Sequence, residues 1–210
     1  MFNIQKKIKT KLFLNPIKCI IWDYDGTLYN DQDTKKIGES LKKVFFLISK
    51  KYNSTLTLKN FEKKSQILGS WVAATNFYSN ISIIDLLDLT SEKINKEKYI
   101  KPNPKIVNFI ESTKDRYIHL ILTNSTSKEV LYGLSKIGFA NNPFKKIFSR
   151  DITQKLKPDL NLFKEIQQFT KLNKKNILCI GDSLFSDIKP AIEYGLKAIP
   201  IWEINNFFSF

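Results

Sequence analysis

The second half of the chain alternates short apolar runs with segments of helical periodicity, and this alternation constrains the fold more than any other feature. Apolar runs at residues 118–123, 176–181 and 197–201 have the length and character of buried strands. The segments between them place apolar residues at helical spacing. Strands and helices that alternate in this way need right-handed crossovers, which build a parallel sheet with helices on both faces. We therefore predict an α/β fold with a Rossmann-like, doubly wound parallel sheet.

The remaining pattern predicts a helical block inserted after the first strand. A short apolar run at residues 17–22 predicts that strand, and the pattern is then helical to about residue 101. Pro102 and Pro104 mark the boundary after which strands and helices alternate. Thr57 and Ser82 are suitable helix N-caps. Helices are expected at residues 33–51, 58–68, 71–78, 82–98, 104–114, 127–137, 159–170 and 187–194, with a further strand at 146–148.

Composition excludes several classes of protein. With 42% hydrophobic and 26% charged residues, the chain is typical of a soluble globular protein. No apolar run approaches the roughly 20 residues that cross a bilayer. The first 16 residues lack the apolar stretch of a secretory signal, so we expect a cytoplasmic protein. Cys19 and Cys179 are too few for a disulfide scaffold and are expected to be reduced and buried, and His119, inside an apolar run, is expected to be structural.

The formal net charge of +14 raises the question of a polyanionic partner. All but two of the 34 basic residues are lysine, whereas recognition of bases and phosphates favours the arginine fork. We therefore expect no nucleic-acid partner and no membrane partner. Ile4, Ile8 and Leu12 have amphipathic helical spacing among lysines, and we expect this segment to pack on the domain or to be disordered. The positive field still favours phosphorylated substrates.

Polar residues stand where the predicted strands end. Because ligands bind at the carboxyl ends of parallel strands, these residues are the candidates for chemistry. They are Asp23, Asp25 and Gly26 after the first strand, Thr123 and Asn124 after the second, Lys157 in a later loop, and Asp182 and Asp187 after the strand at 176–181. Taken singly, each has an ordinary explanation, such as a helix N-cap for Asp187 or a solvated side chain for Lys157. Their order and placement together indicate a site.

This order of motifs resembles that of the haloacid dehalogenase (HAD) superfamily, and in particular its phosphatase branch. The resemblance spans residues 17–201 and includes framework positions such as Ile147 and Phe148. It implies an HAD-like catalytic core of residues 1–30 and 101–210 and an inserted α-helical cap of residues 31–100, with residues 29–31 in the hinge. Within the cap, Gly69 and Trp71 are the candidates for substrate specificity. The alternative for Trp71 is a place in the core of the helical bundle.

The resemblance also implies a role for each candidate residue. Asp23 would attack phosphorus as the nucleophile, and Asp25 would protonate the leaving oxygen and then activate water. Thr123 and Lys157 would stabilise the charge of the transition state. The phosphoryl group would be bound by Asp23, Gly26, Thr123, Asn124 and Lys157. A phosphate dianion approaches several carboxylates only when a divalent cation lies between them. That cation would be Mg²⁺, held by Asp23, the Asp25 carbonyl, Asp182 and, as an outer or additional ligand, Asp187.

The expected function is that of a magnesium-dependent phosphatase that hydrolyses a small phosphorylated metabolite through an aspartyl-phosphate. Sugar phosphates, phosphoglycolate and nucleoside monophosphates all remain candidate substrates, and the protein is expected to be a monomer or homodimer. One alternative is a phosphomutase of the beta-phosphoglucomutase type, which passes the phosphoryl group to a sugar hydroxyl. Another is a non-catalytic nucleic-acid-binding or regulatory protein on the same fold.

Overall fold

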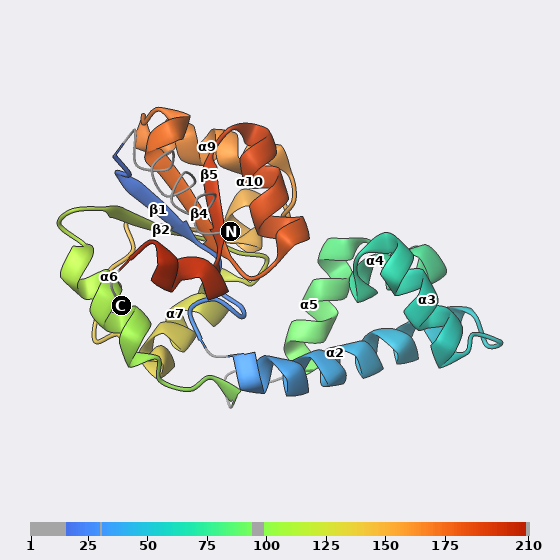
Figure 1. Cartoon of the computed structure of the whole chain (residues 1–210). Helices are drawn as coiled ribbons and strands as arrows, with labels where there is room; N and C mark the ends of the chain where they lie inside the picture. The colour runs from blue at the N-terminus through green and yellow to red at the C-terminus, as the bar shows by residue number, and fades with distance from the viewer. Residues whose placement is uncertain (1–15, 30, 94–98, 209–210) are drawn as a thin grey trace. The chain divides into compact units, whose positions relative to one another are not determined.

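The structure is a computed structural model that describes residues 16–29, 31–93 and 99–208 (Figure 1). The chain divides into two compact units. Met1–Asn30 together with Ile100–Phe210 form the first, and Asp31–Tyr99 form the second, which we call the helical unit. The amphipathic segment expected at Ile4, Ile8 and Leu12 lies outside the described residues.

The first unit contains a five-stranded sheet in which every neighbouring pair is parallel. The strands lie in the order β3-β2-β1-β4-β5. They are β1 (Cys19–Trp22), β2 (Ile118–Leu122), β3 (Lys146–Phe148), β4 (Ile177–Gly181) and β5 (Lys197–Pro200). The predicted α/β fold with a doubly wound parallel sheet is therefore confirmed. Trp22 lies opposite Ile121 of β2 and Ile180 of β4, so the three central strands end at nearly the same level.

Helices cover both faces of this sheet (Figure 1). They are α6 (Pro104–Thr113), α7 (Ser127–Ile137), α8 (Arg150–Thr153), α9 (Leu160–Thr170) and α10 (Lys189–Tyr194), with short turns η2 (Lys174–Asn176), η3 (Leu184–Ile188) and η4 (Ile201–Asn206). Side chains of β1 point alternately to the two faces, as in any strand. Cys19 and Ile21 join a buried cluster with Phe163 of α9, whereas the Trp22 ring meets Phe109 of α6 edge to face at 5.9 Å.

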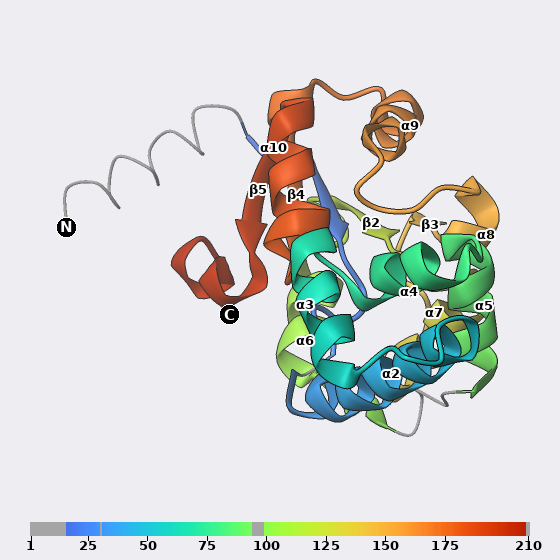
Figure 2. The same ribbon diagram turned by 90° about the vertical axis from the view of Figure 1, so that its right-hand side faces the viewer.

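The helical unit consists of α2 (Asp31–Tyr52), α3 (Leu58–Leu68), α4 (Trp71–Ser79) and α5 (Ile83–Lys93). Helix α4 packs against the other three (Figure 2). Their shared core is formed by Phe45, Ile48, Leu56, Phe61, Ala74 and Leu86. Both predicted caps are confirmed, because the Thr57 hydroxyl accepts from the Asn60 N–H and the Ser82 hydroxyl from the Asp85 N–H. Residues 94–98, predicted to extend the last helix, lie outside the described residues.

Two short elements differ from the prediction. The helix expected at residues 187–194 begins later than predicted: residues 187 and 188 belong to a π-helical turn, η3, and the helix proper, α10, begins at Lys189. The hydroxyl of Ser183 caps this turn, so the N-cap alternative for Asp187 is wrong. Helix α8 was not predicted, because four residues are too few to show a helical period. Within the described part of the chain, no helix combines the length and apolar character that a membrane span needs.

Candidate active site

Asp23 follows β1 and extends its ladder by one residue. Its N–H donates to the carbonyl of Ile180 at 2.9 Å, which fixes the backbone beside β4. Both carboxylate oxygens of Asp23 are engaged. The Thr27 hydroxyl donates to Oδ2 at 2.9 Å, and the Lys157 ammonium donates to Oδ1 at 2.6 Å. The residue is only 5% exposed, so this carboxylate is held rigidly at the end of the strand.

Asp182 and Asp187 complete a cluster of three carboxylates with Asp23. One carboxylate oxygen from each lies within 4.8 Å of the others. Lys157 Nζ donates to Asp187 Oδ1 at 2.6 Å, and the N–H of Ser183 donates to Asp187 Oδ2 at 3.0 Å. The Lys157 ammonium therefore binds two of the three carboxylates directly, and the cluster contains more acidic than basic side chains.

The pKa values reflect this imbalance. Burial raises the pKa of Asp23 to about 8, an effect that Lys157 opposes and that Asp187 and Asp182 increase. Burial and the nearby Asp187 raise the pKa of Asp182 to about 6. Burial alone would lower the pKa of Lys157, but Asp23 and Asp187 raise it above its usual range, so the ammonium stays charged. Oxygen ligands from carboxylates suit Mg²⁺, and the excess of negative charge is what such a cation would neutralise, so this cluster could hold a metal.

Two glycines make room for the carboxylates. Gly26 has φ +80°, and a Cβ there would overlap the Asp182 carboxylate. A Cβ at Gly181 would lie 2.5 Å from side-chain atoms of Asp187. Any larger residue at either position would displace an acidic side chain, because real Cβ atoms do not approach so closely. Gly26 therefore brings the backbone close to Asp182, and its contact with the phosphoryl group stays a prediction.

Thr123 and Asn124 lie beside this cluster at the end of β2. Thr123 Oγ1 accepts the N–H of Ser125 at 3.0 Å, so its own proton points elsewhere. The Asn124 amide pairs with the backbone of Lys157: its Oδ1 accepts the Lys157 N–H at 2.7 Å, and its Nδ2 donates to the Lys157 carbonyl at 3.4 Å. Asn124 therefore ties the loop after β2 to the loop that carries the lysine, a contact that the sequence did not indicate.

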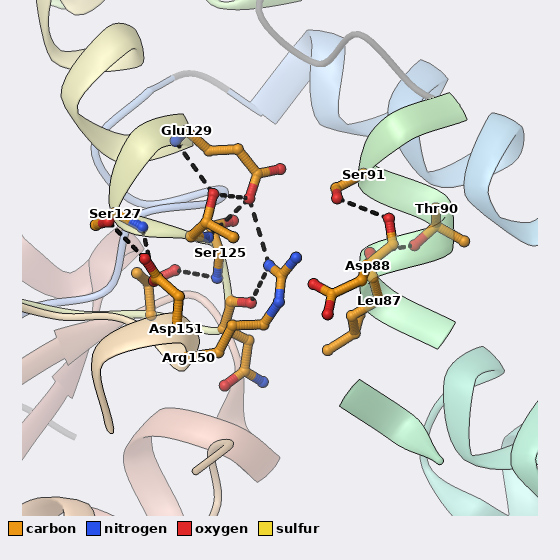
Figure 3. A network of polar contacts seen from close by, with 12 residues as sticks. Leu87, Asp88, Thr90, Ser91, Ser125, Ser127, Glu129, Arg150 and Asp151 are labelled. Atoms are coloured by element: carbon orange, nitrogen blue, oxygen red, sulfur yellow. Dashed lines mark hydrogen bonds and ion pairs between the residues drawn. The ribbon is translucent and has the colours of Figure 1, made fainter. Parts of the chain in front are cut away.

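Arg150 is a buried residue of this region that the sequence analysis missed. Its guanidinium, 4% exposed, donates to the Asn124 carbonyl at 3.0 Å and pairs with Glu129 at 3.3 Å (Figure 3). Glu129 in turn accepts from the N–H and the hydroxyl of Thr126, in a capping box that starts α7. This network orients the loop after β2. The available signal was that Arg150 is one of two arginines in a lysine-rich chain.

Asp25 lies two residues after Asp23 and accepts two hydroxyl hydrogen bonds. Tyr29 Oη donates to Oδ1 at 2.7 Å, and Ser125 Oγ donates to Oδ2 at 2.5 Å. The ring of Tyr29 also meets that of Tyr24 edge to face at 5.3 Å. Tyr29 was expected only as part of a hinge, and Ser125 was assigned no role. The second carboxylate of the first motif is therefore held from two separate loops.

Comparison with known proteins identifies the family. The family model of haloacid dehalogenase-like hydrolases matches residues 20–201. The chain belongs to this family. Its fold is that of the HAD-hydrolase YfnB from Bacillus subtilis bound to magnesium (15% identity, TM-score 0.56, 88% of each chain covered). The same fold is found in a HAD family enzyme from Bacteroides thetaiotaomicron (18% identity, TM-score 0.54, 89% of this chain and 94% of that chain covered). It is also found in a 2-haloacid dehalogenase from Pseudomonas syringae pv. tomato (16% identity, TM-score 0.51, 87% of this chain and 85% of that chain covered). No curated protein matches the chain.

The remaining predicted residues of this HAD hydrolase lie in the helical unit. Gly69 ends α3 in a left-handed conformation with φ +75°. Trp71 begins α4, packs against the core of the unit and lies next to Gly38 of α2. This packing agrees with the alternative that Trp71 belongs to the helical bundle, and a contact of Trp71 with substrate stays a prediction.

The single histidine of the HAD chain is structural, as expected. His119 is 2% exposed, its Nδ1 accepts from the Trp22 indole at 3.0 Å, and its Nε2 lies 3.1 Å from the Thr113 hydroxyl. Burial lowers the pKa of His119 to about 4. Cys19 and Cys179 are both buried and free, which agrees with the expected reduced thiols.

Proposed function

We propose that this HAD hydrolase is a magnesium-dependent phosphatase that acts on a small phosphorylated metabolite through an aspartyl-phosphate on Asp23. The observation that carries the proposal is the cluster of Asp23, Asp182 and Asp187 at one edge of the sheet, with the Lys157 ammonium bonded to two of these carboxylates. Asp25 follows Asp23 by two residues. A structure of the Bacteroides enzyme's variant was solved in complex with magnesium and inorganic phosphate, which supports the same ligands here (17% identity, TM-score 0.52, 88% of this chain and 93% of that chain).

The second carboxylate, Asp25, favours phosphoryl transfer over dehalogenation. The solved structures that share this fold include haloacid dehalogenases, so the fold alone does not choose between the two reactions. Release of an alkoxide from a phosphate ester needs a proton donor, whereas release of halide does not. The resemblance described above implies that the dehalogenases of the family lack an acid at the position of Asp25.

Asp23, Asp182 and the carbonyl of Asp25 would hold the Mg²⁺, with Asp187 beside them. When bound, the cation offsets the charge of the phosphate dianion and lets it approach the carboxylates. One carboxylate oxygen of Asp23 then attacks phosphorus as the bond to the leaving oxygen breaks, and Asp25 gives that oxygen its proton. Asp25 afterwards accepts a proton from the water that hydrolyses the aspartyl-phosphate.

Lys157, Thr123 and Asn124 would bind the phosphoryl oxygens. Lys157 stays charged next to Asp23 and Asp187, so its positive charge is already in place when negative charge develops in the transition state. The hydroxyl proton of Thr123 and the N–H of Asn124 are the neutral donors. We further propose that the helical unit acts as the cap that supplies substrate contacts, with Gly69 and Trp71 as its specificity residues.

A panel of phosphorylated metabolites, assayed for phosphate release with and without Mg²⁺, tests the proposal. We expect hydrolysis that needs Mg²⁺, and loss of turnover in Asp23→Asn with the fold retained. Asp115→Asn is the matched control, because Asp115 is exposed in the turn after α6. Turnover by Asp23→Asn near the wild-type rate would refute the nucleophile assignment.

The same preparation separates the alternatives. Isomerisation of a sugar phosphate in the presence of its bisphosphate, without free phosphate, would identify a phosphomutase. Halide release from 2-chloropropionate, with no phosphatase activity, would identify a dehalogenase. Salt-dependent retention on DNA or RNA, with no hydrolysis of any ester, would identify a nucleic-acid-binding protein.

A further inference from the structure

We infer that Tyr29 and Ser125 are positioning residues that hold the Asp25 carboxyl group in the orientation in which it protonates the leaving oxygen. This inference rests on the proposed function. The two hydroxyls reach different oxygens of the same carboxylate, at 2.7 Å from Tyr29 and 2.5 Å from Ser125. Each of the two residues is only 2% exposed, so water does not readily replace either contact.

Two contacts on two oxygens control the rotation of the carboxyl plane. The terminal torsion of an aspartate has a broad energy minimum, so a carboxyl group with one partner, or none, turns over a wide range. A donor on each oxygen leaves one orientation. Tyr29 is four residues from Asp25 and Ser125 is 100 residues away, so these two hydrogen bonds join the loop after β1 to the loop after β2.

Hydroxyls suit this task because they donate and accept. When Asp25 gives its proton to the leaving oxygen, the P–O bond to that oxygen breaks, the Asp23–phosphorus bond forms, and Asp25 is left ionised. Both hydroxyls then donate to it, which is the arrangement seen in the structure. When Asp25 is protonated, the hydroxyl beside the protonated oxygen can rotate and accept a hydrogen bond from it. The carboxyl group is therefore held before and after the transfer.

Tyr24 offers a matched control for Tyr29. It lies in the same loop, its ring contacts that of Tyr29, and it is equally buried, at 2% exposed. Its hydroxyl, however, donates to the backbone carbonyl of Glu129 at 3.3 Å. Tyr24→Phe thus removes a buried tyrosine hydroxyl from the same loop without removing a hydrogen bond to Asp25 that the structure records.

The test compares two leaving groups. p-Nitrophenolate leaves without a proton, whereas an alkoxide needs one, so only the alkyl ester depends on correct placement of the general acid. We expect Tyr29→Phe and Ser125→Ala to lower kcat/KM by about 10- to 100-fold for the alkyl phosphate that the wild type hydrolyses fastest. The same variants should lower kcat/KM for p-nitrophenyl phosphate by less than about threefold, and Tyr24→Phe should change both values by the same factor.

The possible results separate the inference from the proposed function. Equal losses on the two esters, or no loss on either, would overturn the positioning role while leaving the phosphatase proposal in place. If the wild type hydrolyses neither ester, the proposed function is wrong and the inference falls with it. The two substitutions change different loops and are nearly isosteric, so a folding failure in one leaves the other to decide, and circular dichroism identifies such a failure.

Discussion

The two units of the molecule bury polar groups in different ways. In the helical unit, the buried hydroxyls of Ser49 and Ser65 each donate to the backbone carbonyl four residues earlier in the same helix. In the first unit, the buried polar contacts at the sheet edge include long-range ion pairs, such as that of Lys157 and Asp23, which are 134 residues apart.

This difference distinguishes polar groups that serve the fold from those that serve chemistry. A hydroxyl bonded within its own helix is satisfied locally and adds no charge. Buried carboxylates that outnumber their ammonium partner cost stability, because each charge has lost its hydration. Among the described residues, the first unit contains one such cluster, at the carboxyl ends of β1 and β4.

The largest effect is expected from removing the ammonium of the cluster. Lys157→Met should lower kcat by at least about a hundredfold, because a preorganised positive charge beside the phosphoryl group is lost. Lys155→Met is the matched control: this lysine lies two residues away and pairs with Glu165 at 2.6 Å, but both side chains are about one-third exposed. We expect kcat of the control within about twofold of the wild type, since exposed ion pairs contribute little. Similar losses in the two variants would remove the distinction between cluster and surface.

The next effect is the acid sensitivity of the first unit, which contains the only histidine of the chain. His119 titrates at 6.5 when unfolded and at about 4 when folded, so between these values the unfolded state binds more protons. Its contribution to stability is complete above pH 6.5 and is lost as the pH falls toward 4, up to about 3 kcal/mol. The raised pKa values of Asp23 and Asp182 act in the opposite direction, so the difference between wild type and a variant isolates the histidine.

Urea unfolding of wild type and His119→Leu at several pH values measures this difference. The variant should be less stable at pH 7, because the Trp22 indole loses its acceptor, and the gap should narrow as the pH approaches 4. A gap that is independent of pH would show that His119 does not titrate in this range.

The parts of the fold that the sequence predicts correctly are those with a local sequence signal, such as a helix cap or an apolar face. The helix expected at residues 127–137 matches α7, and that expected at 58–68 matches α3, because each begins at a threonine cap and keeps one apolar face. Asp23, Thr123 and Asp182 could be assigned to one edge from sequence, because parallel strands of similar length end together. Pairings within that edge could not be assigned. The contacts of Ser125 with Asp25 and of Arg150 with Asn124 depend on distances between loops that no local pattern encodes.

Asp187 illustrates the same limit at a single position. As the first residue of a predicted helix, it has the sequence context of an N-cap. The structure instead contains a π-helical turn, which is rare and has no sequence signature, and this turn places Asp187 against Lys157. The position at which the helix starts therefore determines whether Asp187 is a helix cap or a member of the carboxylate cluster.

Mg²⁺ should stabilise the first unit through this cluster. At a concentration one hundred times its Kd, a ligand that binds only the folded state adds about 3 kcal/mol to stability. We expect the wild-type Tm to rise with Mg²⁺ and to return to its starting value with EDTA. Asp182→Asn should reduce the rise, whereas Asp115→Asn should not. An undiminished rise in Asp182→Asn would place the ion elsewhere.

The smallest effect compares two helix caps, one from each unit. Thr126 caps α7 and Thr57 caps α3, and each hydroxyl accepts an N–H three residues later, at 3.2 and 3.3 Å. Alanine at either position should cost about 1 kcal/mol of stability. Only Thr126 also donates to Glu129, which pairs with Arg150 beside the loop after β2. Thr126→Ala should therefore also lower kcat, by about threefold, or less than 1 kcal/mol in the barrier. Thr57→Ala should lose stability alone, because its hydrogen bond stays within the first turn of its own helix. Equal kcat values in the two variants, at equal loss of Tm, would mean that the Glu129–Arg150 contact supports the fold without orienting the site.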